Sequence, residues 1–422
     1  MQQGGGVVLL ADSNGGAKDG GGGIYSLRPP APRSFPGKLV RPALLFAVLA
    51  TGLFLLLVLG GGGGGYGAAA ASSYYYRLPR RLSVPDAGIP PPCSARHDQD
   101  SDDSPERWWA RPAARSAWHN MSDEELLWAA SFEPRRYPPP WPHKPKPKVA
   151  FMFLTRGPLP LAPLWERFFS GAGRELFSVY VHATPGYRLD FPPSSPFHRR
   201  QVPSKAARWG DPSIVDAEQR LLANALLDIT NAHFVLLSES CIPLHPFPAI
   251  HHYLTRSRHS FVGAFDDPGP HGRGRYPAAL APDIASSQWR KGAQWFTLRR
   301  DLAVFFVSDG AYYPKFRRLC RPPCYVDEHY LPTVLSAVAP RGIANRTVTW
   351  VDWSRGGAHP ATFGAADVGA AFLEGLTGKK KKKKESCMYN GQPAEVCFLF
   401  ARKFAPSALP PLLRLSPELL GY

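Results

Sequence analysis

The sequence predicts an α/β domain with a mostly parallel central β-sheet, and three observations support this fold class. From Lys148 onward, short apolar runs rich in β-branched and aromatic residues alternate with stretches that have the 3.6-residue periodicity of an amphipathic helix. Glycine or polar loops close the apolar runs, as is typical of buried strands that lead into helices. Hydrophobic residues make up 44% of the 422 residues, which is enough for a sizeable core.

The predicted strands and helices follow one another along this domain. We expect strands in KVAFMFL, LFSVYVH and HFVLLS, a strand and then a helix in QWFTLRRDLAVFFVS, a helix in DEHYLPTVLSAV and a last strand in TVTWVDW. A helix is also expected over residues 213–229, because its apolar residues fall on one face, and Ser213 is predicted to be its N-cap. Parallel sheets bind ligands at the carboxyl ends of their strands. The candidate binding loops are therefore those that follow Leu154, His182, Leu237 and Trp350.

The first 147 residues are predicted to form a tail, a membrane anchor and a stem. Residues 1–41 are rich in glycine and carry more basic than acidic side chains, so this tail is expected to stay cytoplasmic. Within residues 42–60, an uncharged apolar run of 17 residues lies at the short end of the range that spans a membrane. We expect one transmembrane helix that serves as an uncleaved type II signal anchor. A cleaved signal peptide is the alternative, because the alanine run 68–71 could supply a cleavage site.

The rest of the chain fits the lumen of the secretory pathway. Residues 61–147 are interpreted as a disordered Pro- and Gly-rich lumenal stem with one helix behind a capping box of Ser122 and Glu125, and residues 148–422 as the folded lumenal domain. Disulfides form in that compartment, and we expect the pairs Cys387–Cys397 and Cys320–Cys324. The six cysteines have none of the spacings of a structural zinc site. Two sequons begin at Asn120 and Asn345 and are usable for glycosylation only in the lumen.

The chain is strongly basic, with a net charge of +17. Six of these charges come from the lysine run 379–384, which we interpret as a solvated loop, and the excess without them is +11. A basic surface attracts phosphates, acidic polysaccharides, anionic lipids or nucleic acid. Nucleic-acid binding is disfavoured, because the predicted anchor and the sequons place the domain in the lumen. An excess that only adds solubility is the alternative.

The stretch CRPPCYVDEHYLPT, residues 320–333, presents three adjacent titratable side chains behind a loop that two prolines stiffen. Asp327 is predicted to cap the helix that starts here. Glu328 has two interpretations: a first-turn carboxylate favoured by the helix dipole, or a general base that accepts a proton from an acceptor hydroxyl. No task is predicted for His329.

Other candidate side chains lie at the ends of apolar runs. Arg402 and Lys403 either stabilise a departing nucleoside diphosphate, whose negative charge needs cations, or are simply solvated. Trp350 and Trp353 flank the start of a Gly-Gly turn and are either saccharide-binding rings or core residues. The paired carboxylate Asp266–Asp267 lies in a loop, but no Asp-x-Asp follows a predicted strand, so no divalent metal site is expected.

Six motifs, taken in order, resemble the core-2/I-branching β-1,6-N-acetylglucosaminyltransferase family (glycosyltransferase family 14), and more closely its plant branch associated with brittle culm. They are WGDPSIVDAEQRLL, FVLLSESCIPL, WRKGAQWFTLRRDL, CYVDEHYLPT, VDWSRGGAHPATF and CFLFARKFAPSAL. The resemblance runs from about Lys148 to Leu413, and the order of tail, anchor and stem is similar too. It implies a GT-A-like α/β fold. It also implies a single-pass type II enzyme of the Golgi membrane that transfers a sugar from a UDP-sugar, with inversion and without a divalent metal or other cofactor.

The resemblance implies roles for individual residues as well. Glu328 matches the catalytic base of the family, and Lys403 matches the lysine that contacts the donor diphosphate, where Arg402 could assist. Trp350 matches an aromatic residue that contacts the acceptor. The expected acceptor-binding residues are Trp350, Trp353, Arg273 and Arg275, and the expected donor-nucleotide residues are Phe153, Thr155, His182 and Trp209.

Two departures from the animal members of the family leave the donor sugar open. Thr184 stands where those members have an aspartate that contacts the nucleotide, and no arginine directly precedes Cys397. We expect N-acetylglucosamine as the donor sugar and a hydroxyl of a glycan or glycoprotein as the acceptor, with an effect on cell-wall composition. Transfer of xylose or glucuronic acid is the alternative, as is a catalytically silent, membrane-anchored saccharide-binding protein.

Overall fold

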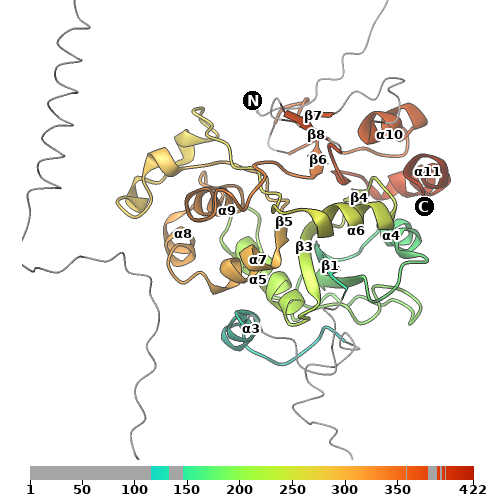
Figure 1. Cartoon of the computed structure of the whole chain (residues 1–422), viewed down its shortest axis with the longest axis horizontal. Helices are drawn as coiled ribbons and strands as arrows, with labels where there is room; N and C mark the ends of the chain where they lie inside the picture. Colours follow the sequence, from blue (N-terminus) through green and yellow to red (C-terminus); the bar gives the residue numbers. More distant parts are fainter. Residues whose placement is uncertain (1–115, 133–145, 358, 379–386, 390–391, 395) are drawn as a thin grey trace, which may run out of the picture. The chain divides into compact units, whose positions relative to one another are not determined.

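A four-stranded mixed β-sheet lies at the centre of the protein, whose computed structural model describes residues 116–132, 146–357, 359–378, 387–389, 392–394 and 396–422 (Figure 1). The strand order is β2-β1-β3-β5, with bounds β1 Lys148–Leu154, β2 Phe177–His182, β3 Asn231–Ser238 and β5 Thr297–Arg299. β1 pairs in parallel with β2 and with β3, whereas β5 runs antiparallel to β3. The predicted α/β class is confirmed and is compatible with a GT-A-like fold, but the sheet carries one antiparallel edge strand.

β1 is apolar along nearly its whole length because both faces of the sheet are covered. Successive side chains of a strand point to opposite faces. Ala150 and Met152 accordingly join one buried cluster, whereas Val149, Phe151 and Phe153 join the other. The alternation assigns each side chain of the central strand to one of two cores.

Two layers of helices enclose these cores (Figure 1). The core that contains Met152 is shared with α5 Ser213–Leu226, α7 Arg300–Ser308, α8 Tyr313–Leu319 and α9 Val326–Val338. The core that contains Phe151 is shared with α4 Ala162–Phe169, α6 Phe247–Arg256, α10 Ala370–Thr377 and α11 Leu409–Leu415. Short helical turns complete the described part: η1 Arg273–Arg275, η2 Ala278–Leu280, η3 Ser286–Gln288, η4 Pro406–Ala408 and η5 Ser416–Leu420.

The start of α5 differs from the predicted one. The helix begins at Ser213 itself, and Pro212 occupies the N-cap position, so the predicted Ser213 cap is wrong. The Ser213 N–H donates to Oδ1 of Asp211 over 2.8 Å, while the Ser213 hydroxyl accepts the N–H of Arg208 over 3.1 Å. The carboxylate of Asp211, and not the Ser213 hydroxyl, therefore accepts a backbone N–H at the start of α5.

A second sheet brings the end of the chain to the central one. Its strand order is β4-β9-β6, with bounds β4 Ile242–Pro243, β6 Thr349–Val351 and β9 Phe400–Arg402, while β7 Cys387–Tyr389 and β8 Gln392–Ala394 form a separate hairpin. The N–H of Phe404 donates to the carbonyl of Ser240 over 2.9 Å. The segment that follows β9 is thus fastened to the loop that follows β3.

The helix α3, Asp123–Ala130, packs on the folded domain, although its sequence was assigned to the stem. The predicted capping box of Ser122 and Glu125 is present, and Leu126 and Ala130 are buried in the core shared with α5. The folded part therefore begins before Lys148, because this helix contributes its apolar face to the core.

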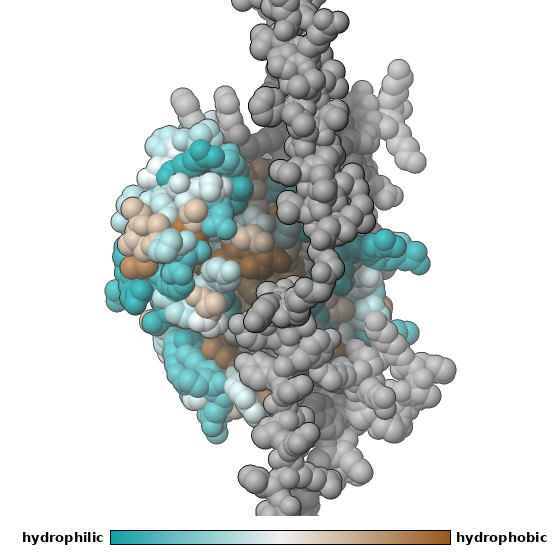
Figure 2. Space-filling model, turned by 60° about the vertical axis from the view of Figure 1, so that its left-hand side comes forward, coloured by the Kyte–Doolittle hydropathy of each residue, from teal (hydrophilic) through white to brown (hydrophobic). Residues whose placement is uncertain are grey.

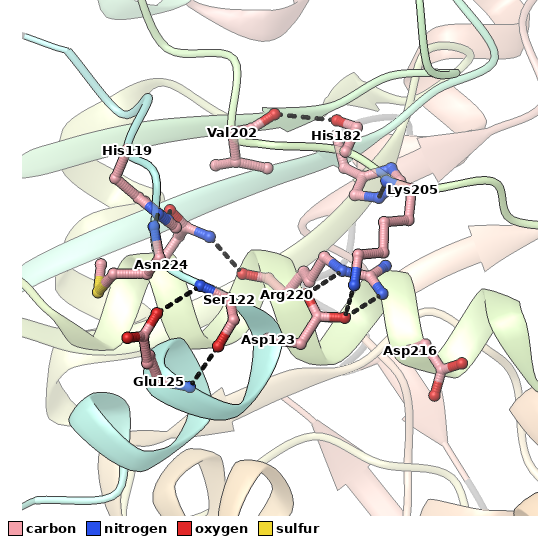
Figure 3. A network of polar contacts seen from close by, with 12 residues as sticks. His119, Ser122, Asp123, Glu125, His182, Val202, Lys205, Asp216, Arg220 and Asn224 are labelled. Carbon is pink, nitrogen blue, oxygen red and sulfur yellow. Dashed lines mark hydrogen bonds and ion pairs between the residues drawn. The ribbon is translucent and has the colours of Figure 1, made fainter.

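An ion-pair network fixes the N-terminus of α3 on α5 (Figure 3). The two carboxylate oxygens of Asp123 accept hydrogen bonds of 2.7 Å from Nε and Nη2 of Arg220, and Nζ of Lys205 lies 2.6 Å from Oδ2. The hydrogen bond from Arg220 is the main reason that the pKa of Asp123 is lowered from 3.8 to about 2. The lowered pKa means that the charged form stabilises the fold.

We expect Asp123→Asn to lower the free energy of unfolding at pH 7 by about 1 kcal/mol, a value reduced for solvent screening because the carboxylate is partly exposed. The pKa of Asp123 is lower in the folded chain, so this stabilisation is present above about pH 4 and is lost as the pH falls towards 2. Urea unfolding at both ends of that range measures the difference. Glu124→Gln, on an exposed carboxylate of the same turn, is the matched control. An equal loss at pH 7 and pH 2.5 would contradict the assignment to Asp123.

The structure leaves several sequence predictions outside its described part. In the residues that it describes, no helix is both long enough and apolar enough to cross a membrane. The predicted anchor 42–60, the tail, most of the stem and the lysine run lie outside the described residues.

On the face shown in Figure 2, hydrophobic residues lie between broader hydrophilic areas.

The cysteines are placed as follows. A Cys320–Cys324 disulfide is present, with the two Cα atoms 5.3 Å apart. Cys241 is a buried free thiol. Cys397 is disulfide-bonded, and the side chain of its predicted partner Cys387 lies outside the described residues.

Candidate active site

Glu328 lies in the first turn of α9, directly behind the disulfide loop. Tyr325 precedes the helix in the left-handed conformation, with φ of 43°, and turns the chain sharply into it. The Glu328 carbonyl accepts the N–H of Gly292 over 2.9 Å, which ties this turn to the loop before β5. The disulfide, the Tyr325 turn and this bond hold the backbone of Glu328 in place.

Two cations contact the Glu328 carboxylate. Nη1 of Arg275 lies 2.8 Å from Oε2, and Nζ of Lys291 lies 3.6 Å from the same oxygen. The side chains of Arg275, Lys291 and Glu328 are 13%, 10% and 20% exposed, so the group is largely shielded but still open to solvent. The guanidinium of Arg275 also stacks over the Tyr325 ring, 4.5 Å from its centroid. These contacts hold the Glu328 carboxylate through Oε2.

Asp327 does not cap the helix, so that prediction is wrong. It is the second residue of α9, and no side chain caps this helix. Its carboxylate is buried, and Oδ1 has no hydrogen-bond partner among the described atoms. Burial, reinforced by the neighbouring Glu328 charge, raises the pKa of Asp327 to about 7. The left-handed Tyr325 redirects the chain so that Asp327 turns inward.

A second buried carboxyl group lies behind Asp327. Glu218 on α5 accepts a hydrogen bond of 2.8 Å from Nε2 of Gln294. Burial raises the pKa of Glu218 well above its usual value, and the charge of Asp327 adds to the shift. His329 is buried too: its ring stacks on Trp289 with centroids 4.5 Å apart, and Nδ1 lies 2.9 Å from the carbonyl of Arg290. These groups support the start of α9 from inside and do not face the solvent-accessible carboxylate.

The two basic residues after β9 have different surroundings. The Arg402 guanidinium stacks over the Trp295 ring at 4.0 Å, and its Nε is enclosed without a hydrogen-bond partner among the described atoms. Lys403 is half-buried, and burial is the main cause that lowers its pKa. The stacking on Trp295 holds the partly buried Arg402 in place, so its guanidinium is less available to a diphosphate than the amine of Lys403.

The predicted donor residues separate into buried and accessible ones. Phe153 is 1% exposed and packs between Trp165 and Phe197, so its side chain belongs to the core and not to a nucleotide site. Thr155 is buried as well, and its N–H donates to the His182 carbonyl over 2.9 Å. Their backbone still lines the carboxyl end of the sheet.

His182 and Trp209 are placed differently from each other. His182 is buried, its Nε2 accepts the N–H of Lys205 over 3.3 Å, and burial lowers its pKa to about 4 (Figure 3). Trp209 is 49% exposed and packs against Tyr325, with ring centroids 4.9 Å apart. The structure thus brings Trp209 to the helix start that carries Glu328.

The four predicted acceptor residues have different surroundings. Arg273 forms an exposed ion pair of 2.7 Å with Asp266, whereas Arg275 reaches Glu328. Trp350 packs against Phe363 and Phe372, and Trp353 is half-buried beside the Gly-Gly turn.

The paired carboxylates Asp266 and Asp267 contact different groups. Asp266 binds Arg273, and Oδ1 of Asp267 accepts the N–H of Gly269 over 2.8 Å. Within the described residues, no three His, Cys, Asp or Glu side chains gather as a metal would need. The sequon residues Asn120 and Asn345 are both exposed, and the Asn345 side-chain carbonyl accepts the N–H of Ala264.

The structure adds two cations that the sequence prediction missed. Lys291 lies in the motif WRKGAQW, two residues after the buried Trp289, and this position was the only sign of a role in the sequence. Arg156 follows β1 directly, in a loop that was already a candidate. Arg156 could have been identified from the sequence as a basic residue at a strand end. Lys291 can be recognised only from its contact with Glu328 in the folded chain.

A surface cavity of about 410 Å³ lies away from these residues. Its lining includes Glu166, Arg174 and Phe177, at the amino end of β2. Open α/β sheets bind ligands at the opposite, carboxyl end of their strands. The candidate site is therefore defined by Glu328 and the strand-end cations and not by this cavity.

Comparison with known proteins identifies the family. Residues 149–377 match the family model described as Core-2/I-Branching enzyme. The chain is also 35% identical over 309 residues to a protein of Oryza sativa subsp. japonica named Glycosyltransferase BC10, an alignment that covers 64% of this chain and 76% of that protein. The family match includes Arg275, Lys291 and Glu328 and ends before Lys403.

Proposed function

Because the chain belongs to the core-2/I-branching enzyme family and is a glycosyltransferase, we propose that it transfers a sugar from a UDP-sugar with inversion, and that Glu328 is the general base. One observation carries this assignment: the Glu328 carboxylate is held at the start of α9 by Arg275 and Lys291 while it stays partly open to solvent. A general base must be rigidly aimed at the proton that it takes. Glu328 meets this condition through the contacts of Oε2 with Arg275 and Lys291.

In the proposed reaction the acceptor hydroxyl gives its proton to Glu328 as its oxygen bonds to the anomeric carbon. The bond between that carbon and the β-phosphate oxygen breaks on the opposite face, and the electron pair leaves with UDP. Lys403, at the end of β9, offsets the charge that develops on the diphosphate. The products are the glycosylated acceptor, UDP and a proton carried by Glu328, which solvent removes.

The donor and the acceptor are proposed from the family. We infer N-acetylglucosamine as the transferred sugar, with xylose or glucuronic acid as the alternatives, and a hydroxyl of a glycan or glycoprotein as the acceptor. Arg275 contacts Glu328, and the half-exposed Trp209 packs against Tyr325 at the same helix start, so both are candidates for sugar contacts. Trp353 is a further candidate from the sequence, because aromatic rings pack on the apolar faces of sugars.

The location is proposed from the sequence. A type II protein of the Golgi membrane would place the domain in the lumen, where the Cys320–Cys324 disulfide is stable. An effect on cell-wall composition follows if the acceptor belongs to a secreted polymer or glycoprotein. Protease digestion of sealed Golgi vesicles tests the topology, and loss of the C-terminal domain without detergent would overturn it.

The function is tested by UDP release from a panel of UDP-sugars with the purified lumenal part from residue 116 onward. We expect release with one UDP-sugar and an unchanged rate in excess EDTA, because Lys and Arg side chains supply the positive charge that a metal would otherwise bring. A rate that falls with EDTA and returns with Mn²⁺ would contradict the metal-independent mechanism and make Asp266 and Asp267 the first residues to test.

A further inference from the structure

Two cations at the carboxyl end of the central sheet have no ion-pair or hydrogen-bond partner for their side chains among the described residues. Arg156 follows β1 and is exposed, and Lys403 follows β9 and is half-buried. Their charges influence each other: after burial, the positive charges of Arg402 and Arg156 both lower the pKa of Lys403. The carboxylate of Glu239 acts in the opposite direction and offsets part of this repulsion between like charges.

Backbone contacts explain why these residues meet. β1 and β3 pair with Leu154 opposite Ser238, so Arg156 leaves the sheet beside the loop that follows Ser238. The N–H of Phe404 donates to Ser240 in that same loop. Within the Arg156 loop, the Thr155 hydroxyl accepts the N–H of Gly157 over 3.1 Å. Both cations therefore stand on segments fastened to one loop, at the end of the sheet where α/β domains bind ligands.

The charge balance at this end of the sheet favours an anion. Glu239 is the carboxylate whose charge acts on both Arg402 and Lys403, so one carboxylate stands against these two cations, with Arg156 as a third cation that acts on Lys403. Arg402 is already stacked on Trp295. A site with Lys403 and Arg156 free to move can take a group with two negative charges, and a nucleoside diphosphate carries at least that many.

We propose that Arg156 is the second cation of the donor-diphosphate site and binds the phosphate oxygens together with Lys403. This assignment rests on the proposed function, in which a diphosphate leaves from this end of the sheet. The planar guanidinium can donate two parallel hydrogen bonds to one phosphate, which a lysine cannot do. Arg156 thereby takes the role that the sequence prediction gave to Arg402.

Titration calorimetry with UDP and, separately, with inorganic pyrophosphate tests the assignment on the folded lumenal part. We expect Arg156→Gln to weaken the binding of both ligands about 10- to 100-fold, the range of a lost charge-assisted hydrogen bond. Arg156→Lys should restore part of this loss because it keeps the charge. Arg341→Gln, on an exposed arginine beyond the far end of α9, whose axis rises about 15 Å from Glu328 to Val338, is the matched control and should change neither affinity.

The outcomes separate this inference from the proposed function. If Arg156→Gln bound each ligand, UDP and pyrophosphate, as tightly as the wild type does, the role of Arg156 would be overturned. The proposed UDP-sugar reaction would still stand. Pyrophosphate binding that depends on Arg156, without any binding of UDP, would support the anion site and overturn the uridine donor. A wild-type protein that binds neither ligand would overturn both.

Discussion

Glu328→Gln is expected to reduce the transfer rate by about 10²- to 10⁴-fold, the usual range for loss of a general base. Glutamine keeps the size of the side chain but cannot accept the proton of the acceptor hydroxyl. The domain should stay folded, because the disulfide and the Gly292–Glu328 backbone bond hold the helix start without the charge. UDP affinity should remain near that of the wild type, since Glu328 contacts Arg275 and Lys291 and not the cations after β1 and β9. Initial rates of UDP release and UDP titration measure the two effects separately.

Two further variants make this result specific. Glu328→Asp keeps the charge but moves the carboxylate back by one methylene, so we expect an intermediate rate that reports how closely the base must be placed. Glu124→Gln makes the same chemical change in the first turn of α3, on an exposed side chain, and should have the activity of the wild type. Turnover of Glu328→Gln within a few-fold of wild type would remove Glu328 from the mechanism.

The central strands could be predicted because their pattern is local. β1 is apolar nearly throughout and β2 is buried along its whole length, since both faces of the sheet are covered, and the apolar runs are visible in the sequence. The direction of β5 was not visible. Only three residues, Thr297–Arg299, form this strand, and its antiparallel pairing with β3 is set by the path of the chain that precedes it.

In the candidate site, the sequence predicted single residues but not the contacts between them. Glu328 had two interpretations from its position, a carboxylate favoured by the helix dipole or a base, and the family resemblance favoured the base. The structure adds contacts that suit this role. Asp327 was interpreted as a cap from its position, but the left-handed Tyr325 places its carboxylate inside the protein. Lys291 is distant from Glu328 in the sequence, and the Arg402 guanidinium stacks on Trp295, so both assignments depended on tertiary contacts.

The second large effect is expected for Lys403→Gln, which should lower kcat about 10²- to 10³-fold, the range found when one group that stabilises developing negative charge is removed. Lys403 lies at the end of β9 without a side-chain ion pair among the described residues, so its charge is available to the leaving diphosphate. The ground-state diphosphate of the donor already carries charge, so UDP affinity should fall too. The loss in kcat should be the larger one, because the β-phosphate oxygen gains its charge only as the sugar leaves.

A matched pair of variants distinguishes this role from a general loss of positive charge. Lys403→Arg should recover part of the rate. Lys315→Gln should leave the rate unchanged, because Lys315 lies on α8 and forms an ion pair with Asp283 at the surface, and such pairs contribute little to stability. Single-turnover rates and UDP titration separate kcat from binding. If Lys403→Gln kept the wild-type kcat while Arg156→Gln lost it, the leaving group would depend on the β1 loop and not on β9. Lys403 would then have no role in stabilising the leaving group, and its lowered pKa would only reflect burial and the neighbouring arginine charges.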